Sequence, residues 1–160
     1  MRAKLLILIF CMLLSACGFR LAGTADLPDQ LASIYLVTNG FSDTQRRVLQ
    51  HSLTQAGAKL EEQQGTEAVK LTVTLKKAPD RQMATSASSG KIVKRITRKI
   101  DFNVKSGDGK TLVPMRSLTQ QKDVSLNDDS LLSSDREKAT VTKELEQALF
   151  DQLIRQLTLI

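Results

Sequence analysis

The stretch KIVKRITRKIDFNVK, Lys91–Lys105, is the longest strand that the sequence predicts. Because side chains alternate between the two faces of a strand, its apolar residues fall on one face. These residues are Ile92, Ile96, Ile100, Phe102 and Val104. The opposite face is polar or charged from Arg95 to Lys105. Lys94 and Arg98 interrupt the apolar face near its beginning, so we expect that end of the strand to lie outside the deep core.

Further strands are predicted on both sides of this stretch. The sequence from Ser106 to Gly109 is typical of a hairpin turn, because Asp and Gly tolerate the backbone angles of tight turns. The chain then returns as a strand from about Lys110 to Ser125, in which Pro114 favours an edge position or a bulge. Upstream, apolar and polar residues alternate from Ala68 to Lys76, as in a half-buried strand.

The remaining strand signals are shorter. A β-branched, apolar run from Ser33 to Thr38 predicts a strand that ends at Asn39-Gly40. The segment 58–62 is either a short strand or a loop. Pro79 breaks the sheet or lies at its edge. The small, polar segment 83–90 predicts a flexible connection or the frayed tip of a long hairpin.

Two amphipathic helices complete the pattern. Ser42 and Gln45 form a capping-box signal for a helix over residues 43–56, which Gly57 ends. A second capping-box signal, Ser134 with Glu137, predicts the start of a long C-terminal helix. Its apolar stripe contains Val141, Leu145, Ala148, Leu149, Leu153 and Leu157. An alternative start at Asp128 or Asp129 would place Leu131 and Leu132 in the first turn.

The order strand, helix, strands, helix predicts an α+β fold. We expect a two-layer sandwich, in which a mostly antiparallel or mixed sheet of about four strands carries two helices on one face. The chain has 160 residues, of which 41% are hydrophobic and 25% charged, which suits one domain with its own core. Aromatic residues make up only 4% and Trp is absent, so Leu, Ile and Val must build most of that core.

The N-terminus carries a targeting signal. Arg2 and Lys4 precede an apolar run of about ten residues, which is too short to span a bilayer and is typical of a secretory signal peptide. Leu14-Ser15-Ala16-Cys17 at its end resembles the bacterial lipobox, which implies cleavage before Cys17 and lipidation of its thiol. The predicted divisions are a cleaved signal peptide (1–16), a lipidated tether (17–26) and a single domain (27–160).

The residues around Cys17 refine this prediction. Gly18 follows the cysteine, where an Asp usually retains a lipoprotein in the inner membrane, so the resemblance implies sorting to the outer membrane. Phe19 and Leu21 in the tether are candidates for docking on the domain. The other cysteine, Cys11, lies in the signal peptide, so no thiol remains for a disulfide.

No catalytic or cofactor-binding pattern is evident. His51 is the one histidine and falls on the predicted outer face of the first helix, where a surface role is the usual one. No Cys and His residues have the spacing of a metal site, and no glycine-rich loop has a phosphate-binding pattern. We therefore expect no enzyme, metal or cofactor. The formal net charge of +6 permits a polyanionic partner, and export argues against nucleic acid.

One cluster of charge does suggest binding. Five cations lie within nine residues of the longest strand: Lys91, Lys94, Arg95, Arg98 and Lys99. Alternation divides them, with Lys91, Arg95 and Lys99 on one face and Lys94 and Arg98 on the other. Four more cations would enlarge the patch if the neighbouring strands flank this one: Lys76, Lys77, Arg81 and Arg116. Such a patch either binds an anion such as phosphate or simply protects an exposed edge strand.

Several short motifs resemble a known family. Cys17-Gly18-Phe19-Arg20-Leu21, with Pro28 shortly after, and the run from Gln152 to Leu157 are similar to the lipopolysaccharide-assembly lipoproteins of Gram-negative bacteria, the LptE family. The resemblance implies a lipoprotein on the periplasmic side of the outer membrane, with a sheet and two packed helices. It also implies a partner, the β-barrel translocon LptD, whose lumen the lipoprotein plugs and whose assembly it assists, and a ligand, lipopolysaccharide.

The resemblance also implies where lipopolysaccharide would bind. Family members carry basic residues near the strand hairpin and near the start of the last helix, at positions that hold Ser88 and Ser134 here. Lys91 and Arg136 are close neighbours and would substitute for them. The candidate lipopolysaccharide-binding residues are Lys91, Lys94, Arg95, Arg98, Lys99 and Arg136.

Three functions remain open at this point. The first is a lipopolysaccharide-binding subunit of the translocon, for which we expect Lys94, Arg95 and Arg98 to lie together on an exposed strand. The second is a structural plug and chaperone of the barrel that does not handle lipopolysaccharide. The third is an envelope hydrolase, which would need a nucleophile and base that the sequence does not offer.

Overall fold

The computed structural model describes residues 27–86, 91–127 and 131–160. The predicted signal peptide and lipidated tether lie outside these residues, as do Ser88 and the alternative helix start at Asp128 or Asp129. The elements are η1 (Asp29–Leu31), β1 (Ser33–Asn39), α2 (Asp43–Gln55), β2 (Lys59–Glu61), β3 (Val69–Lys77), β4 (Arg81–Ser86), β5 (Lys91–Lys105), β6 (Thr111–Asn127) and α3 (Leu131–Leu157).

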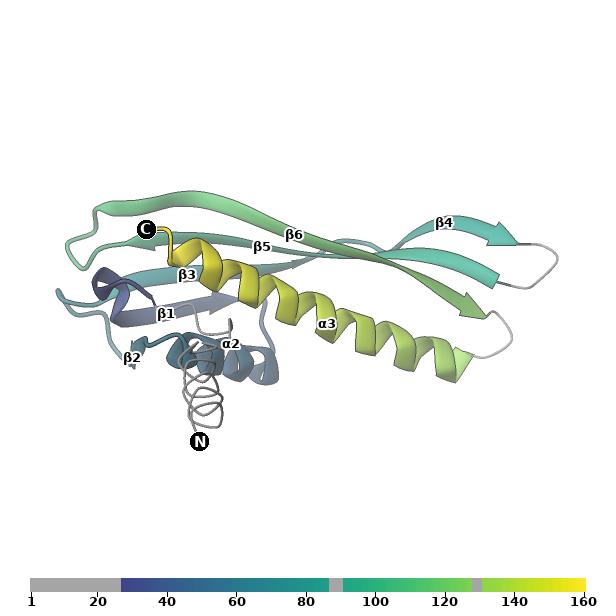
Figure 1. The fold of residues 1–160 in the computed structure, drawn as a ribbon, viewed down its shortest axis with the longest axis horizontal. Helices are drawn as coiled ribbons and strands as arrows, with labels where there is room; N and C mark the ends of the chain where they lie inside the picture. The colour runs from purple at the N-terminus through teal and green to yellow at the C-terminus, as the bar shows by residue number, and fades with distance from the viewer. Residues whose placement is uncertain (1–26, 87–90, 128–130) are drawn as a thin grey trace, which may run out of the picture.

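The strands form one mixed sheet with β5 as its long central member (Figure 1). The strand order is β2-β1-β3-β5-β4, and β6 pairs with the other edge of β5. β1 runs parallel to β2 and to β3, whereas the three pairs that involve β5 are antiparallel. β3 and β4 follow one another along the same edge of β5, and Pro79 lies in the break between them, as predicted.

The sheet has six strands within the described residues, two more than the four expected. The first additional strand is β2, in the segment 58–62 that the sequence analysis gave as either a short strand or a loop. The second is β4, which includes Arg81–Ser86 and was predicted from residue 83 onward only as a flexible connection or a hairpin tip. Small polar residues give β4 no hydrophobic alternation, so backbone pairing with β5 holds it in the sheet.

Both helices pack on one face of the sheet, as predicted (Figure 1). Of the five apolar residues predicted on this face of β5, Ile96, Ile100, Phe102 and Val104 are buried, and Ile92 is half-buried. Leu49 and Leu53 from α2, and Leu149 and Leu153 from α3, form one core with Ile100, Phe102 and Val104, and all four leucines are fully buried. Burial of large aliphatic side chains is thus the main stabilising contribution in this domain.

Local signals set several element ends. Ser42 and Gln45 form the predicted capping box at the start of α2, with the Ser42 backbone N–H donating to Gln45 Oε1 at 2.8 Å. The predicted hairpin turn is present, with Gly109 at a φ of +88° and its N–H donating to the Ser106 carbonyl at 2.9 Å. Pro114 lies on the edge strand β6, beside a register shift opposite residues 102–104.

The start of α3 differs from the main prediction. The helix already includes Leu131, so Ser134 lies inside it and does not cap it. Ser134 is 8% exposed, which fits a position against the sheet. The early start lets α3 follow the sheet along a second, smaller hydrophobic cluster of Ile96, Val124, Leu126, Val141 and Leu145.

This second cluster supports an extension of the molecule. In Figure 1, β4 and the adjoining ends of β5, β6 and α3 project away from α2, β1 and β2. We call this extension the arm and the remainder the body. No helix in the described ranges is long and apolar enough to cross a membrane.

Candidate binding face

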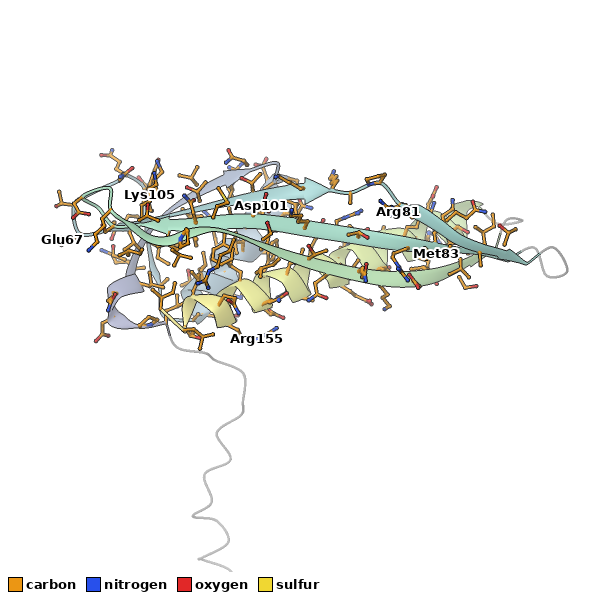
Figure 2. The ribbon with its side chains drawn as sticks, turned by 90° about the horizontal axis from the view of Figure 1, so that it is seen from above. Glu67, Arg81, Met83, Asp101, Lys105 and Arg155 are labelled. Carbon is orange, nitrogen blue, oxygen red and sulfur yellow. The ribbon has the colours of Figure 1, made fainter. Side chains whose placement is uncertain are left out.

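The sheet face opposite the helices is uncovered in the described part of the chain, and we call it the open face. β5 contributes its odd-numbered side chains from Arg95 to Lys105, which alternate with the buried Ile96, Ile100, Phe102 and Val104 and so belong to the face opposite the helices. Figure 2 is a view onto the sheet, in which Lys105, Asp101 and Arg81 follow one another along its length. The open face therefore extends from the body onto the arm.

Strand pairing places cations opposite one another on this face. Lys70 pairs with Lys105 and Lys76 with Lys99 across β3 and β5, and Arg81 pairs with Arg95 across β4 and β5. Like charges directly opposite on adjacent strands repel one another. Such pairs are stable where an anion, from the protein or from a ligand, lies between them.

Asp101 supplies an anion at the centre of the face. Its carboxylate contacts the Lys76 ammonium, lies 3.6 Å from Lys99 Nζ and accepts a hydrogen bond of 2.5 Å from Ser117 Oγ. Asp101 is 8% exposed. The hydrogen bonds from Lys76 and Ser117 hold the pKa of this carboxyl below its usual range. The Lys76 and Lys99 pair is thereby partly neutralised within the protein.

Asp123 has the same role on the arm. Arg95 Nε and Nη2 donate to its two carboxylate oxygens at 2.7 and 2.8 Å, in a bidentate pair between β5 and β6. The pair lowers the pKa of Asp123 and raises that of Arg95. Arg81, on the opposite side of Arg95, has no ion-pair partner among the described residues.

A shallow pocket of about 310 Å³ lies beside these arginines. It is located where β3 has ended and β4 begins, so that Ile96 and Thr97 of β5 have no strand partner on that side. Its lining residues are Ala78, Pro79, Arg81, Met83, Arg95, Thr97 and Gln121. Two guanidinium groups, a hydroxyl and an amide can all donate hydrogen bonds there. This donor set suits an oxyanion such as phosphate.

The structure divides the six predicted binding residues. Arg95 and Lys99 lie on the open face, as their alternation predicts. Lys94 lies on the helix side and is half-buried opposite Val124. Lys91 is at the start of β5, in register with Asn127, and its side chain is outside the described part. Arg136 is exposed on α3.

Arg98 corrects the expected exposed cluster of Lys94, Arg95 and Arg98. Its side chain is 12% exposed and lies between the sheet and α3, on the opposite face from Arg95. Its Nη2 donates to Thr142 Oγ1 at 3.1 Å, and its Nε lies 3.9 Å from Glu146 Oε1. A guanidinium held in this position is not available to an external ligand on the open face.

The four flanking cations that the sequence analysis named are divided between the two faces of the sheet. The flanking strands place Lys76 and Arg81 on the open face, whereas Lys77 pairs with Arg98 and Arg116 with Phe102 on the helix side. Thr97, Gln121 and Asp123 were not identified from the sequence. These three residues join the face because of how β5 and β6 are paired. The predicted turn over residues 106–109 would have given this pairing to within a residue or two, and with it the residues that lie opposite one another.

The other predictions on chemistry concern isolated residues. His51 is exposed on α2, as its position in the predicted helix indicates. In residues 27–86, 91–127 and 131–160, no three His, Cys, Asp or Glu side chains are grouped to hold a metal ion.

Solved structures with this arrangement of sheet and helices are known. The minor lipoprotein of Acinetobacter baumannii is 18% identical with a TM-score of 0.60, over 80% of this chain and 91% of that one. Lipoprotein B of Nitrosomonas europaea is 16% identical with a TM-score of 0.69, over 88% of this chain and 90% of that one. Rare lipoprotein B of Shewanella oneidensis is 11% identical with a TM-score of 0.64, over 78% of this chain and 92% of that one.

The fold is one found in bacterial lipoproteins. At identities below 20%, this likeness concerns the fold alone. A scan against protein-family models and a search of curated protein sequences both match nothing.

Proposed function

We propose that this protein is an outer-membrane lipoprotein, anchored through Cys17 on the periplasmic side, that binds lipopolysaccharide. In this proposal it is not an enzyme, and its protein partner is the β-barrel LptD, whose lumen it plugs and whose assembly it assists. Lipopolysaccharide then passes to the outer leaflet through the complex. The lipobox at Leu14–Cys17 and the LptE-like motifs support this proposal, as does the fold that the chain shares with bacterial lipoproteins of known structure.

The observation that carries the lipopolysaccharide part is the pocket between Arg81 and Arg95. Lipopolysaccharide bears phosphates on lipid A and on its inner core. A phosphate in this pocket would accept hydrogen bonds from Arg81, whose guanidinium has no acidic partner on the described chain, and from Thr97 and Gln121. It would also relieve the repulsion between Arg81 and Arg95, since Asp123 compensates only the second of these charges.

Charge reversal at Arg81 tests the ligand. We expect Arg81→Glu to weaken binding of purified protein to lipopolysaccharide by about tenfold or more, because a hydrogen bond to a charged group contributes roughly 1.5–3 kcal/mol. The matched control is Arg47→Glu on α2, which changes the net charge equally on an exposed position outside the pocket. Equal lipopolysaccharide affinities for the two variants would show that the pocket is not the lipopolysaccharide-binding site.

A second comparison separates charge from specific geometry. The pair Arg95→Asp with Asp123→Arg keeps the ion pair between β5 and β6 and moves the cation away from the pocket. It should bind lipopolysaccharide as weakly as Arg81→Glu. Dephosphorylated lipopolysaccharide should not distinguish any of these variants from the natural protein.

The alternative function is a structural plug and chaperone of the barrel without lipopolysaccharide binding. One observation favours it: Asp101 and Asp123 neutralise much of the open face from within, which leaves a mixed polar surface suited to a polar barrel wall. Under this alternative, Arg81→Glu should reduce the amount of barrel that co-purifies from solubilised outer membrane and should leave lipopolysaccharide affinity unchanged. Retained barrel with lost lipopolysaccharide binding would contradict it.

A further inference from the structure

The helix side of the molecule contains a groove that the proposed function does not use. It has a volume of about 640 Å³ and lies between the first half of α2 and the middle of α3. Val48 from α2 and Ala139 and Phe150 from α3 give it apolar walls. Val48 is 37% exposed and is one of few large hydrophobic side chains in the described residues that remain open to solvent. Covering the Val48 side chain with another apolar group would therefore be favourable.

The groove also contains a buried acceptor without a donor. Glu146 lines it and is only 6% exposed. Its Oε1 has no hydrogen-bond partner, and the nearest cation, Arg98 Nε, is 3.9 Å away. A buried carboxylate oxygen in this state is costly unless a donor reaches it. Since this oxygen is itself buried, an occupant of the groove meets mainly the apolar side chains of its walls, among which Val48 and Ala139 are exposed.

The N-terminal tether can supply such an occupant. The Leu27 N–H donates to the Ala56 carbonyl at 2.9 Å, so the chain enters the domain beside the C-terminal end of α2. The 13 residues of α2 span about 20 Å. The eight residues from Phe19 to Asp26 extend up to about 26 Å. This length is enough to bring Phe19 back along α2 to the groove at its other end.

We propose that Phe19-Arg20-Leu21 docks in the groove between α2 and α3. In an extended segment, Phe19 and Leu21 point to one side and Arg20 to the other. The two apolar side chains would cover Val48 and Ala139, which are exposed in the groove, while Arg20 stays in water.

The docking has a consequence for orientation. If Cys17 carries the lipid, as proposed above, only Gly18 separates the anchor from the docked segment. The α2–α3 side then faces the membrane and the open face points away from it. This consequence rests on the proposed lipidation, whereas the docking itself does not.

A photo-crosslinker at position 19 tests the docking in the intact lipoprotein in its own membrane. With p-benzoylphenylalanine in place of Phe19, we expect crosslinks within one chain to α2 or α3 near Val48 and Phe150, identified by mass spectrometry. Crosslinks to a second copy or to another protein would overturn the proposal, and so would the absence of any crosslink. Lipopolysaccharide binding is not part of the readout, so this result is separate from that of the proposed function.

A variant of the groove provides the control. Val48→Glu should reduce the intramolecular crosslink about tenfold, because a charge replaces an apolar contact. Met115→Glu makes the same kind of change at a hydrophobic residue that is 64% exposed outside the groove, and should leave the yield unchanged. If Val48→Glu does not fold, Ala139→Phe fills the groove without a charge. Equal yields in all variants would contradict the proposal.

Discussion

At the scale of single residues, Asp101 is one of two carboxylates, with Asp123, that make the open face sensitive to acid. Lys76 and Ser117 hold its pKa below the ordinary value of about 3.9. A depressed pKa in the folded state means that the stabilisation is complete above the unfolded pKa and is lost as pH falls through the folded pKa. Urea unfolding between pH 5 and pH 2 should show a steeper loss of stability for the natural protein than for Asp101→Asn. If the stability of both proteins fell equally with pH, Asp101 would not contribute to the acid sensitivity of the fold.

At the scale of elements, α2 depends on its N-terminal cap. Ser42 Oγ accepts a hydrogen bond from the Gln45 backbone N–H at 3.3 Å, and Gln45 Oε1 accepts one from the Ser42 backbone N–H at 2.8 Å. Loss of such a cap costs about 1 kcal/mol. We therefore expect Ser42→Ala to lower the free energy of unfolding by about that amount in denaturant titration. Thr44→Ala, at the exposed second residue of the helix, should change the free energy of unfolding by only a few tenths of a kcal/mol.

At the scale of the whole molecule, a polar layer separates two hydrophobic clusters. Arg98 lies between Ile96 of the arm cluster and Ile100 of the body core, and Glu146 lies between Leu145 and Leu149 in the same way. Thr142 contacts this ion pair from α3. Arm and body thus share β5, β6 and α3 but bury their apolar side chains separately. We expect the arm to open locally at a lower free energy than the body.

A matched pair of substitutions on α3 measures that difference. Leu149→Ala removes a fully buried side chain from the body core and should lower global stability by about 2–5 kcal/mol. Leu145→Ala, one turn earlier in the smaller cluster, should mainly accelerate amide hydrogen exchange in β4 and the adjoining ends of β5 and β6. Equal acceleration throughout the sheet in both variants would mean that arm and body unfold as one unit.

Prediction from sequence succeeded where a side-chain pattern alone sets the structure. The alternation of Ile100, Phe102 and Val104 identified the buried face of β5, and the Ser42 to Gln45 signal located the start of α2. The main prediction for the start of α3 was wrong, because Ser134 and Glu137 match a capping box yet lie within a helix that packing on the arm extends to Leu131. A capping-box sequence shows where a helix can begin, whereas packing against the sheet decides at which of these residues it does begin.

The sequence by itself determined the class of fold, the buried side of each long element and the division of the basic cluster between two faces. These follow from hydrophobic periodicity, which acts over a few residues. Only the tertiary structure placed β4 in the sheet, paired Arg81 with Arg95 and put Arg98 under α3 beside Glu146. Backbone pairing and register join residues far apart in the chain. Two arginines of the same strand therefore differ in their surroundings: Arg95 is half-buried on the open face and paired with Asp123, whereas Arg98 is enclosed under α3 beside Glu146.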